Sequence, residues 1–411
     1  VVYGDLTSVR RRVMHKKAGE VIERIYGNEE RYWGAIARHY REGNVRNKFV
    51  VYSIKAGKSA AKKFANEEAI EFFEGALRVV GESEEESTWK IELQEELADV
   101  LELAGRYDEA IEKLKERIGC VNALEAGKDY ARMCEIYIKK GDYENALKMA
   151  EEGEQIVSGI EGSKIVLARL WSAKGYVYER TGNYSKAIEW QEKAKNVFVQ
   201  ENAEKDIGNV FNRIGACYWY LGNFEKAMEF CQKSLELREK NNDLRGIAAS
   251  YNNIGIIYHE KGELDKAIEY FQKSLEIGTQ IGDIASIVEA QTSLSEVYVE
   301  KSEFEAAERH LVEALQGCEQ TGSKSLFANA YFVSGKLAVA KGELERGKEE
   351  IRKAVAIYEE MKSKSFGYYR AIFELGKIER NMEMLEKAHR WFESIGNRVW
   401  VERVKREIAK Q

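Results

Sequence analysis

The sequence contains no proline, although an average chain of 411 residues would have about twenty. Proline interrupts helices because it lacks a backbone N–H and its ring clashes with the preceding turn. Its absence therefore predicts a chain that is helical over nearly its whole length.

Cysteine and histidine are scarce and scattered. The cysteines form no Cys-x-x-Cys pair and their number is odd: Cys120, Cys134, Cys217, Cys231 and Cys318. No two histidines lie at metal-ligand spacing: His15, His39, His259, His310 and His389. We therefore expect no metal site and no disulfide framework. The cysteine pattern fits a reducing, cytoplasmic environment in which cysteine serves as a small apolar residue.

The sequence also lacks the marks of a membrane protein and of an enzyme. No apolar run could span a bilayer, and no signal-peptide core is present, so we expect no membrane partner. The fragment AGKSA at 56–60 ends like a nucleotide-binding loop, but Tyr52 stands where the motif needs glycine, and its surroundings are helical. No Ser-His-Asp or Cys-His order stands out. We expect no catalytic residues, no cofactor and no enzymatic activity.

Charge is distributed unevenly along the chain. The net charge is −6, which gives no support for direct binding of nucleic acid over the whole surface. Residues 1–63 hold 15 Lys and Arg against 6 Asp and Glu, whereas residues 64–105 hold 2 against 13. Such blocks indicate either solvated helix faces or local docking surfaces. The basic run from Arg10 to Arg12 has no interleaved aromatics, which favours packing against another domain over phosphate contact.

One phrase recurs along most of the chain. GRYDEAIEKL, GNFEKAMEFC and GELDKAIEYF are three of its copies, which begin at positions 64, 105, 141, 182, 222, 262, 302, 342 and 383. Glycine at the first position allows the left-handed backbone that ends a helix. A small residue five positions later, and another seven positions earlier, would let two helices cross closely. The phrase therefore predicts nine helix pairs.

These copies, with large residues at helical spacing such as Phe211, Ile214 and Tyr218, resemble the tetratricopeptide repeat. The spacing of about 40 residues exceeds the family's usual length of about 34, and the usual proline is missing. Both departures indicate longer helices, similar to the repeats of kinesin light chains. The resemblance implies an all-α, right-handed α-α superhelix, a TPR solenoid, over residues 44–411.

Residues 1–43 do not fit the repeat. They predict a capped helix, a turn at Gly27 and Asn28, and a second helix that ends at Gly43. This segment resembles the junction between the winged-helix part of signal-transduction ATPases of the STAND type and their C-terminal repeats. The resemblance is carried by Leu6, Thr7, Arg10, Arg11, Arg12, His15, Ala37, His39 and Tyr40. It implies that this chain, which begins with Val, is a piece of a longer protein with an ATPase upstream.

The candidate binding residues lie on the first helices of the central copies, which line the concave side of a helix-pair solenoid. Asn212 and Asn252 occupy the same repeat position, and each amide can both donate and accept a hydrogen bond. They could bind the backbone of an extended peptide, as the resembling families do, or they could simply cap and solvate the helices. The full candidate set is Asn209, Asn212, Arg213, Trp219, Asn252, Asn253 and His259.

Two functions follow from these observations. The leading hypothesis is a non-catalytic module that binds a protein or peptide in the concave groove, with a small-molecule effector as a further possibility. This module would be the sensor or regulatory part of a signalling ATPase or transcription regulator. The alternative is a free-standing scaffold that assembles protein partners. The presence or absence of an upstream ATPase in the intact gene would distinguish the two.

Overall fold

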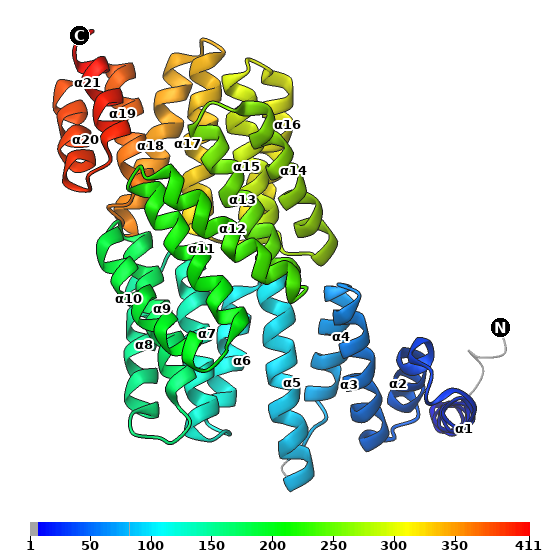
Figure 1. The fold of residues 1–411 in the computed structure, drawn as a ribbon. Helices are drawn as coiled ribbons and strands as arrows, with labels where there is room; N and C mark the ends of the chain where they lie inside the picture. Colours follow the sequence, from blue (N-terminus) through cyan, green and yellow to red (C-terminus); the bar gives the residue numbers. More distant parts are fainter. Residues whose placement is uncertain (1–6, 82) are drawn as a thin grey trace. The chain divides into compact units, whose positions relative to one another are not determined.

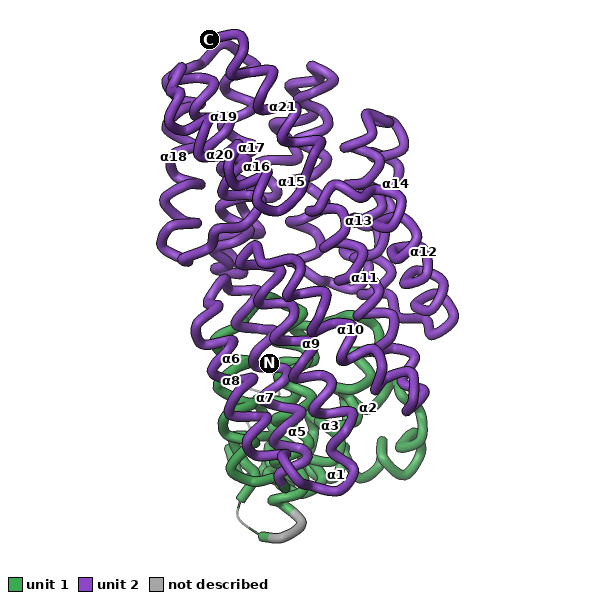
Figure 2. Tube along the Cα trace, turned by 60° about the vertical axis from the view of Figure 1, so that its left-hand side comes forward, with its two compact units in different colours: residues 1–122 green, residues 123–411 purple. Residues whose placement is uncertain are grey.

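The computed structural model describes residues 7–81 and 83–411 (Figure 1). Within these residues all regular elements are helices, which confirms the all-α prediction. Leu6, one of the residues that carry the junction resemblance, lies outside the described part. The chain divides into two compact units, residues 1–122 and residues 123–411 (Figure 2). Whether the solenoid runs on without a break across residue 122 stays a prediction.

Unit 1 begins with the two helices that the N-terminal segment predicts. The hydroxyl of Thr7 caps the first of them by accepting a hydrogen bond from the Arg10 N–H. The predicted second helix starts later than expected, because residues 30–32 form a short 3-10 turn. The elements of unit 1 are α1 (Ser8–Tyr26), η1 (Glu30–Tyr32), α2 (Trp33–Glu42), α3 (Arg46–Lys62), α4 (Asn66–Leu77), α5 (Glu84–Leu103) and α6 (Tyr107–Ile118).

Helix α1 packs against the rest of unit 1 through one of its faces. Gly19 packs so closely on Tyr40 that an added Cβ would lie 3.1 Å from the tyrosine ring. Glu23 accepts hydrogen bonds from the hydroxyls of Tyr40 and Tyr52. The AGKSA fragment lies inside α3, where Lys58 pairs with Glu92 at 2.6 Å. The interpretation of this fragment as ordinary helix is therefore confirmed.

Unit 2 holds seven helix pairs and one further helix. Together with α3/α4 and α5/α6, the described residues contain the nine pairs that the repeat predicts, whereas α21 was not predicted. The elements are α7 (Ala123–Lys140), α8 (Tyr143–Val157), α9 (Lys164–Arg180), α10 (Tyr184–Gln200), α11 (Glu204–Tyr220), α12 (Phe224–Lys240), α13 (Leu244–Glu260), α14 (Leu264–Ile281), α15 (Ile284–Glu300), α16 (Phe304–Thr321), α17 (Lys324–Ala340), α18 (Leu344–Glu360), α19 (Phe366–Glu379), α20 (Met382–Ser394) and α21 (Arg398–Ile408).

The turns inside the pairs have the left-handed backbone that the repeat requires. The first residue of the phrase has φ of +76° at Gly222 and +77° at Gly262, and even Ser302 reaches +60°. The ninth copy departs from this alignment. There the left-handed residue is Arg380, three positions before the expected one, because α19 has only 14 residues where most first helices of unit 2 have 17.

Close helix crossing explains the small residues of the repeat. A Cβ on Gly215 would lie 3.2 Å from the Ala227 carbonyl oxygen and 2.8 Å from the Cys231 sulfur. Likewise, a Cβ on Gly335 would lie 2.9 Å from the Gly347 carbonyl oxygen. The two helices of a pair therefore meet where both carry a small side chain, as predicted.

Segments of unit 2 that are 177 to 183 residues apart are joined by hydrogen bonds. Each bond links a residue beside the turn inside an early pair to the start of α19 or α21, or to the loop before it. We call this line of contacts the seam. Its bonds include Ser363 Oγ to Arg180 O (3.0 Å), Phe366 N to Tyr184 Oη (2.9 Å) and Asn397 Nδ2 to Tyr220 O (2.9 Å). Unit 2 is therefore a superhelix whose successive turns touch.

Candidate functional site

The inner face of unit 2 is defined by side chains that meet across two helix pairs. Arg213 on α11 binds Glu135 on α7 at 2.8 Å, and Arg370 on α19 binds Glu296 on α15. Side chains can reach across two pairs in this way where the superhelix curves inward. The inner face thus corresponds to the concave side on which the sequence places the candidate residues.

Three of the candidate asparagines have hydrogen-bond partners within the chain. The Nη2 of Arg238 donates to Asn209 Oδ1 at 2.8 Å, and Asn253 Nδ2 donates to Asn212 Oδ1 at 3.1 Å. Asn209 is therefore held by a residue of its own repeat, whereas Asn212 and Asn253 join neighbouring first helices. A ligand that used Asn212 would compete with, or add to, its bond from Asn253.

Asn252 differs from these three. Its side chain is only 7% exposed, and its Oδ1 has no hydrogen-bond partner among the described residues. One repeat later, Thr292 occupies the same repeat position, is 8% exposed and also has an unpartnered hydroxyl. Buried polar atoms are nearly always hydrogen-bonded in folded proteins, so two such atoms at one repeat position need an explanation.

Arg213 and Trp219 take part in packing within the chain. The Arg213 guanidinium lies 3.7 Å from the centre of the Tyr176 ring, and the Trp219 ring packs on Tyr220 and Phe366. Nevertheless, Nη1 of Arg213 and Nε1 of Trp219 have no hydrogen-bond partner in the part of the chain that the structure describes. The Trp219 ring therefore belongs to the aromatic cluster at the seam.

His259 belongs to an ionic network that also includes Glu296, Glu300, Lys336 and Arg370. Its Nε2 lies 3.0 Å from Glu300, and Lys336 contacts Glu296 at 2.7 Å and Glu300 at 3.1 Å. Burial alone would raise the pKa of Glu300, but the His259 hydrogen bond and the nearby cations lower it to about 2. We did not expect this network from the sequence. One signal was present, since Glu296 and Lys336 are opposite charges at one repeat position.

Two further carboxylates on first helices were also missed. Glu179 is 6% exposed, and burial raises its pKa to about 7. Desolvation also raises the pKa of Glu289 on α15, although nearby Arg180 lowers it. The charge of Glu289 in turn raises the pKa of Glu179, which Arg180 also lowers. A carboxyl with a pKa of about 7, such as Glu179, can donate as well as accept hydrogen bonds near neutral pH. The inner face therefore combines amide, hydroxyl, guanidinium and carboxyl groups.

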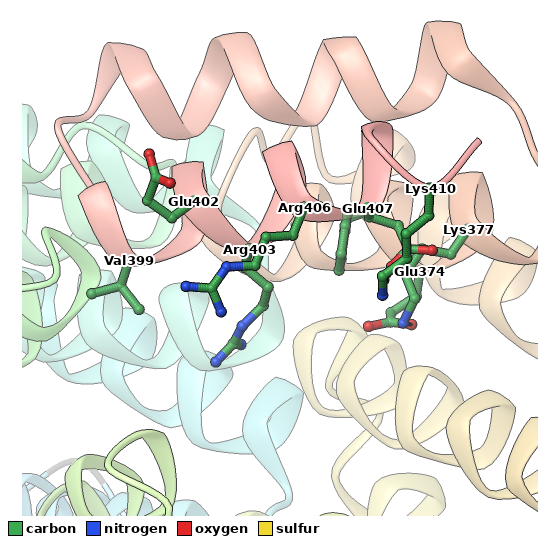
Figure 3. A pocket seen from close by; sticks show the side chains of 9 residues that line it. Glu374, Lys377, Val399, Glu402, Arg403, Arg406, Glu407 and Lys410 are labelled. Atoms are coloured by element: carbon green, nitrogen blue, oxygen red, sulfur yellow. Dashed lines mark hydrogen bonds and ion pairs between the residues drawn. The ribbon is translucent and has the colours of Figure 1, made fainter.

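A cleft of about 400 Å³ lies between α19 and α21 (Figure 3). Seven of its nine lining residues are of charged types, and the lining residues are Phe373, Glu374, Lys377, Val399, Glu402, Arg403, Arg406, Glu407 and Lys410. Lys377 pairs with Glu374 at 2.8 Å, Lys410 pairs with Glu407 at 3.0 Å, and Arg403 pairs with Glu260 at 3.3 Å. Most of its charges are thus neutralised within the chain.

Residues 7–81 and 83–411 contain neither a metal site nor a membrane-spanning helix. No group of three His, Cys, Asp or Glu side chains in this part is arranged to hold a metal ion. Likewise, none of the described helices is both long and apolar enough to cross a membrane.

Family models described as tetratricopeptide repeat match residues 168–197, 206–280 and 246–320. Residues 168–197 and 206–320 thus contain tetratricopeptide repeats, the described residues form a superhelical fold, and repeat modules of this type bind other proteins. No curated protein matches the chain.

Among solved structures, a Rap protein complexed with the competence and sporulation factor shows the same fold. It has a TM-score of 0.53 and 13% identity, over 82% of this chain and 98% of that one. The apo form of RapI has a TM-score of 0.42 and 18% identity, over 88% and 96% of the two chains. A STAND protein with a tetratricopeptide repeat sensor from Pyrococcus horikoshii has a TM-score of 0.41 and 19% identity, over 80% and 54%.

Proposed function

We propose that unit 2 binds an extended protein segment on its inner face. The observation that carries this proposal is the set of buried polar atoms without a partner: Asn252 Oδ1, Thr292 Oγ1, Arg213 Nη1 and Trp219 Nε1. The set contains both an acceptor and donors. An extended backbone offers N–H and C=O groups in alternation, so it can satisfy both kinds of atom.

The energetics favour such a ligand. Leaving a buried polar atom unpaired costs about 1–3 kcal/mol, and a bound backbone would remove that cost at each atom that it reaches. The ionic network around Glu296 would fix the side chains beside this set, so little ordering would be needed on binding. The Rap protein of the same fold, which was solved in complex with a factor, supports the idea that such a superhelix accommodates a ligand.

The finer part of the proposal is that binding acts as a sensing step in a larger regulatory protein. Residues 1–43 would then be the junction to an ATPase or transcription-regulator domain, as their resemblance implies. A ligand that binds without changing the contacts of residues 1–43 would favour the scaffold alternative. Protection of α1 and α2 from hydrogen exchange, measured in the intact protein with and without ligand, distinguishes the two.

The binding site is tested by capturing the partner on the immobilised chain, identifying it by mass spectrometry and titrating it. Asn252→Ala removes no hydrogen bond between residues that the structure describes, so the fold should persist while the affinity falls about fivefold, equivalent to about 1 kcal/mol. Asn252→Ala combined with Asn212→Ala should weaken binding tenfold or more. The control is Asn196→Ala, an exposed position on α10. Unchanged affinity in a folded double variant would place the site elsewhere.

A further inference from the structure

Exposed apolar side chains are concentrated on α1. Ten large apolar residues are exposed over the described residues, and five of them lie on this one helix: Val9 (66%), Val13 (49%), Met14 (56%), Val21 (44%) and Ile25 (57%). The other five are spread over helices α10, α16, α18, α20 and α21. Contiguous exposed apolar surface marks an interaction site in soluble proteins.

Three of these five side chains form a stripe on the free face of α1, whereas Val9 and Val13 lie on the other side of the basic residues described below. Met14, Val21 and Ile25 are separated by seven and four residues, the spacing that places side chains along one side of a helix. Val21 lies two residues after Gly19, so the two side-chain positions are separated by about 200° around the helix axis. Because Gly19 packs against Tyr40, the stripe faces away from the core of unit 1.

A row of basic residues runs beside this stripe. Arg10, Lys17 and Arg24 recur every seven residues, and none of them forms an ion pair with an acidic group of the described chain. Their neighbour Lys16, by contrast, lies 4.0 Å from Glu20. Charges that flank an apolar seam at heptad spacing choose the partner helix in coiled-coil pairing, through contacts with opposite charges.

We infer that the free face of α1 docks an amphipathic helix of a partner or effector domain, whose apolar seam is flanked by Asp or Glu at heptad spacing. The apolar stripe would supply the buried contact, and the basic row would select the acidic flank. A second copy of this chain fits poorly, because pairing α1 with itself would bring two basic rows together. This inference deepens the proposed role of residues 1–43 as a junction.

The probe is a synthetic 21-residue helical peptide with Leu and Ile on its seam and Glu at the flanking positions, titrated against the 411-residue chain. A matched peptide carries Lys in place of Glu. The Glu peptide should bind at least tenfold more tightly than the Lys peptide, with an affinity that falls as salt rises. The double substitution Val21→Ser with Ile25→Ser should weaken binding of the Glu peptide at least tenfold.

The control is Val312→Ser, an equally exposed valine on α16 (49%), which should leave binding unchanged. Charge reversal by Arg10→Glu, Lys17→Glu and Arg24→Glu should make the chain prefer the Lys peptide. Circular dichroism checks that each variant is folded. Asn252→Ala should not affect this binding, so failure of the inner-face proposal and failure of this one can be told apart.

Four results would overturn the inference. The first is equal affinity for both peptides, and the second is no binding of the Glu peptide. The third is dimerisation in sedimentation that Val21→Ser with Ile25→Ser abolishes, which would make the occupant a second copy. The fourth is flotation with phosphatidylserine vesicles but no peptide binding, which would make it a membrane surface.

Discussion

Asn397 offers a direct measure of what the seam contributes to stability. Its side chain is 1% exposed, and its amide makes two separate hydrogen bonds. The Oδ1 accepts a hydrogen bond from Trp400 N at 3.0 Å and so caps α21. The Nδ2 donates to Tyr220 O at 2.9 Å across the seam. Because the two hydrogen bonds use different atoms of the amide, different substitutions can separate their contributions to stability.

Asn397→Ala removes both bonds. Loss of the cap costs about 1 kcal/mol, and the unpaired Tyr220 carbonyl costs about 1–3 kcal/mol more. We therefore expect a loss of about 2–4 kcal/mol in the free energy of unfolding. Asn397→Asp keeps the capping oxygen but replaces the seam donor with an oxygen that faces a carbonyl. Its expected cost is about 1–3 kcal/mol, all of it from the seam.

Asn381→Asp is the matched control. Asn381 caps α20 by accepting a hydrogen bond from Met384 N at 3.2 Å, and among the described residues its amide makes no bond across the seam. Aspartate is as good a cap and suits the positive end of a helix, so this change should alter stability by less than about 0.5 kcal/mol.

Urea unfolding gives the change in stability of these variants, and hydrogen exchange shows where protection is lost. For Asn397→Asp we expect faster exchange in α21 and near Tyr220. If Asn397→Asp is as stable as wild type while Asn397→Ala is not, only the cap matters and the seam bond contributes nothing.

Three further predictions concern unit 2. Ala227→Leu should cost about 1–3 kcal/mol by overpacking the crossing of α11 and α12, and an unchanged melting temperature would contradict this pairing. Glu296→Gln should cost about 3 kcal/mol or more, because two partly buried cations lose their shared carboxylate; urea unfolding measures it. Burial lowers the pKa of His259, but Glu300 and its neighbours outweigh this and raise it. The stability advantage over His259→Gln should therefore be full below pH about 6 and lost as pH rises through the folded pKa, as unfolding at pH 5.5 and 8.5 would show.

The repeat could be predicted from the sequence because each turn carries its own local signal. Glycine at Gly222 and Gly262 is both the signal and the physical cause of the helix end. The signal fails in the ninth copy, where Arg380 takes the left-handed backbone without being a residue type that favours it. Helix α21 lies beyond the last phrase, so no periodicity indicated it.

The seam could not be predicted from the sequence. It forms because each helix pair is rotated slightly relative to the one before, and these rotations accumulate over more than four repeats until two turns of the superhelix meet. The same limit applies to the candidate residues. Repeat position correctly placed Asn252 on a first helix, but only the structure shows that its Oδ1 lacks a partner while the Trp219 ring is packed on Phe366. Tertiary contacts, not residue type, decide which groups are available.

The seam also limits how the length of this protein can change. In an ordinary solenoid each repeat touches only its neighbours, so a repeat can be gained or lost at a local cost. Here, removing one repeat between Tyr184 and Phe366 would shift every later loop by about 40 residues and set each turn against the wrong partner. The number of repeats in this region is therefore tied to the pitch of the superhelix. Duplication and deletion, the usual routes by which repeat proteins evolve, would have to alter the pitch at the same time.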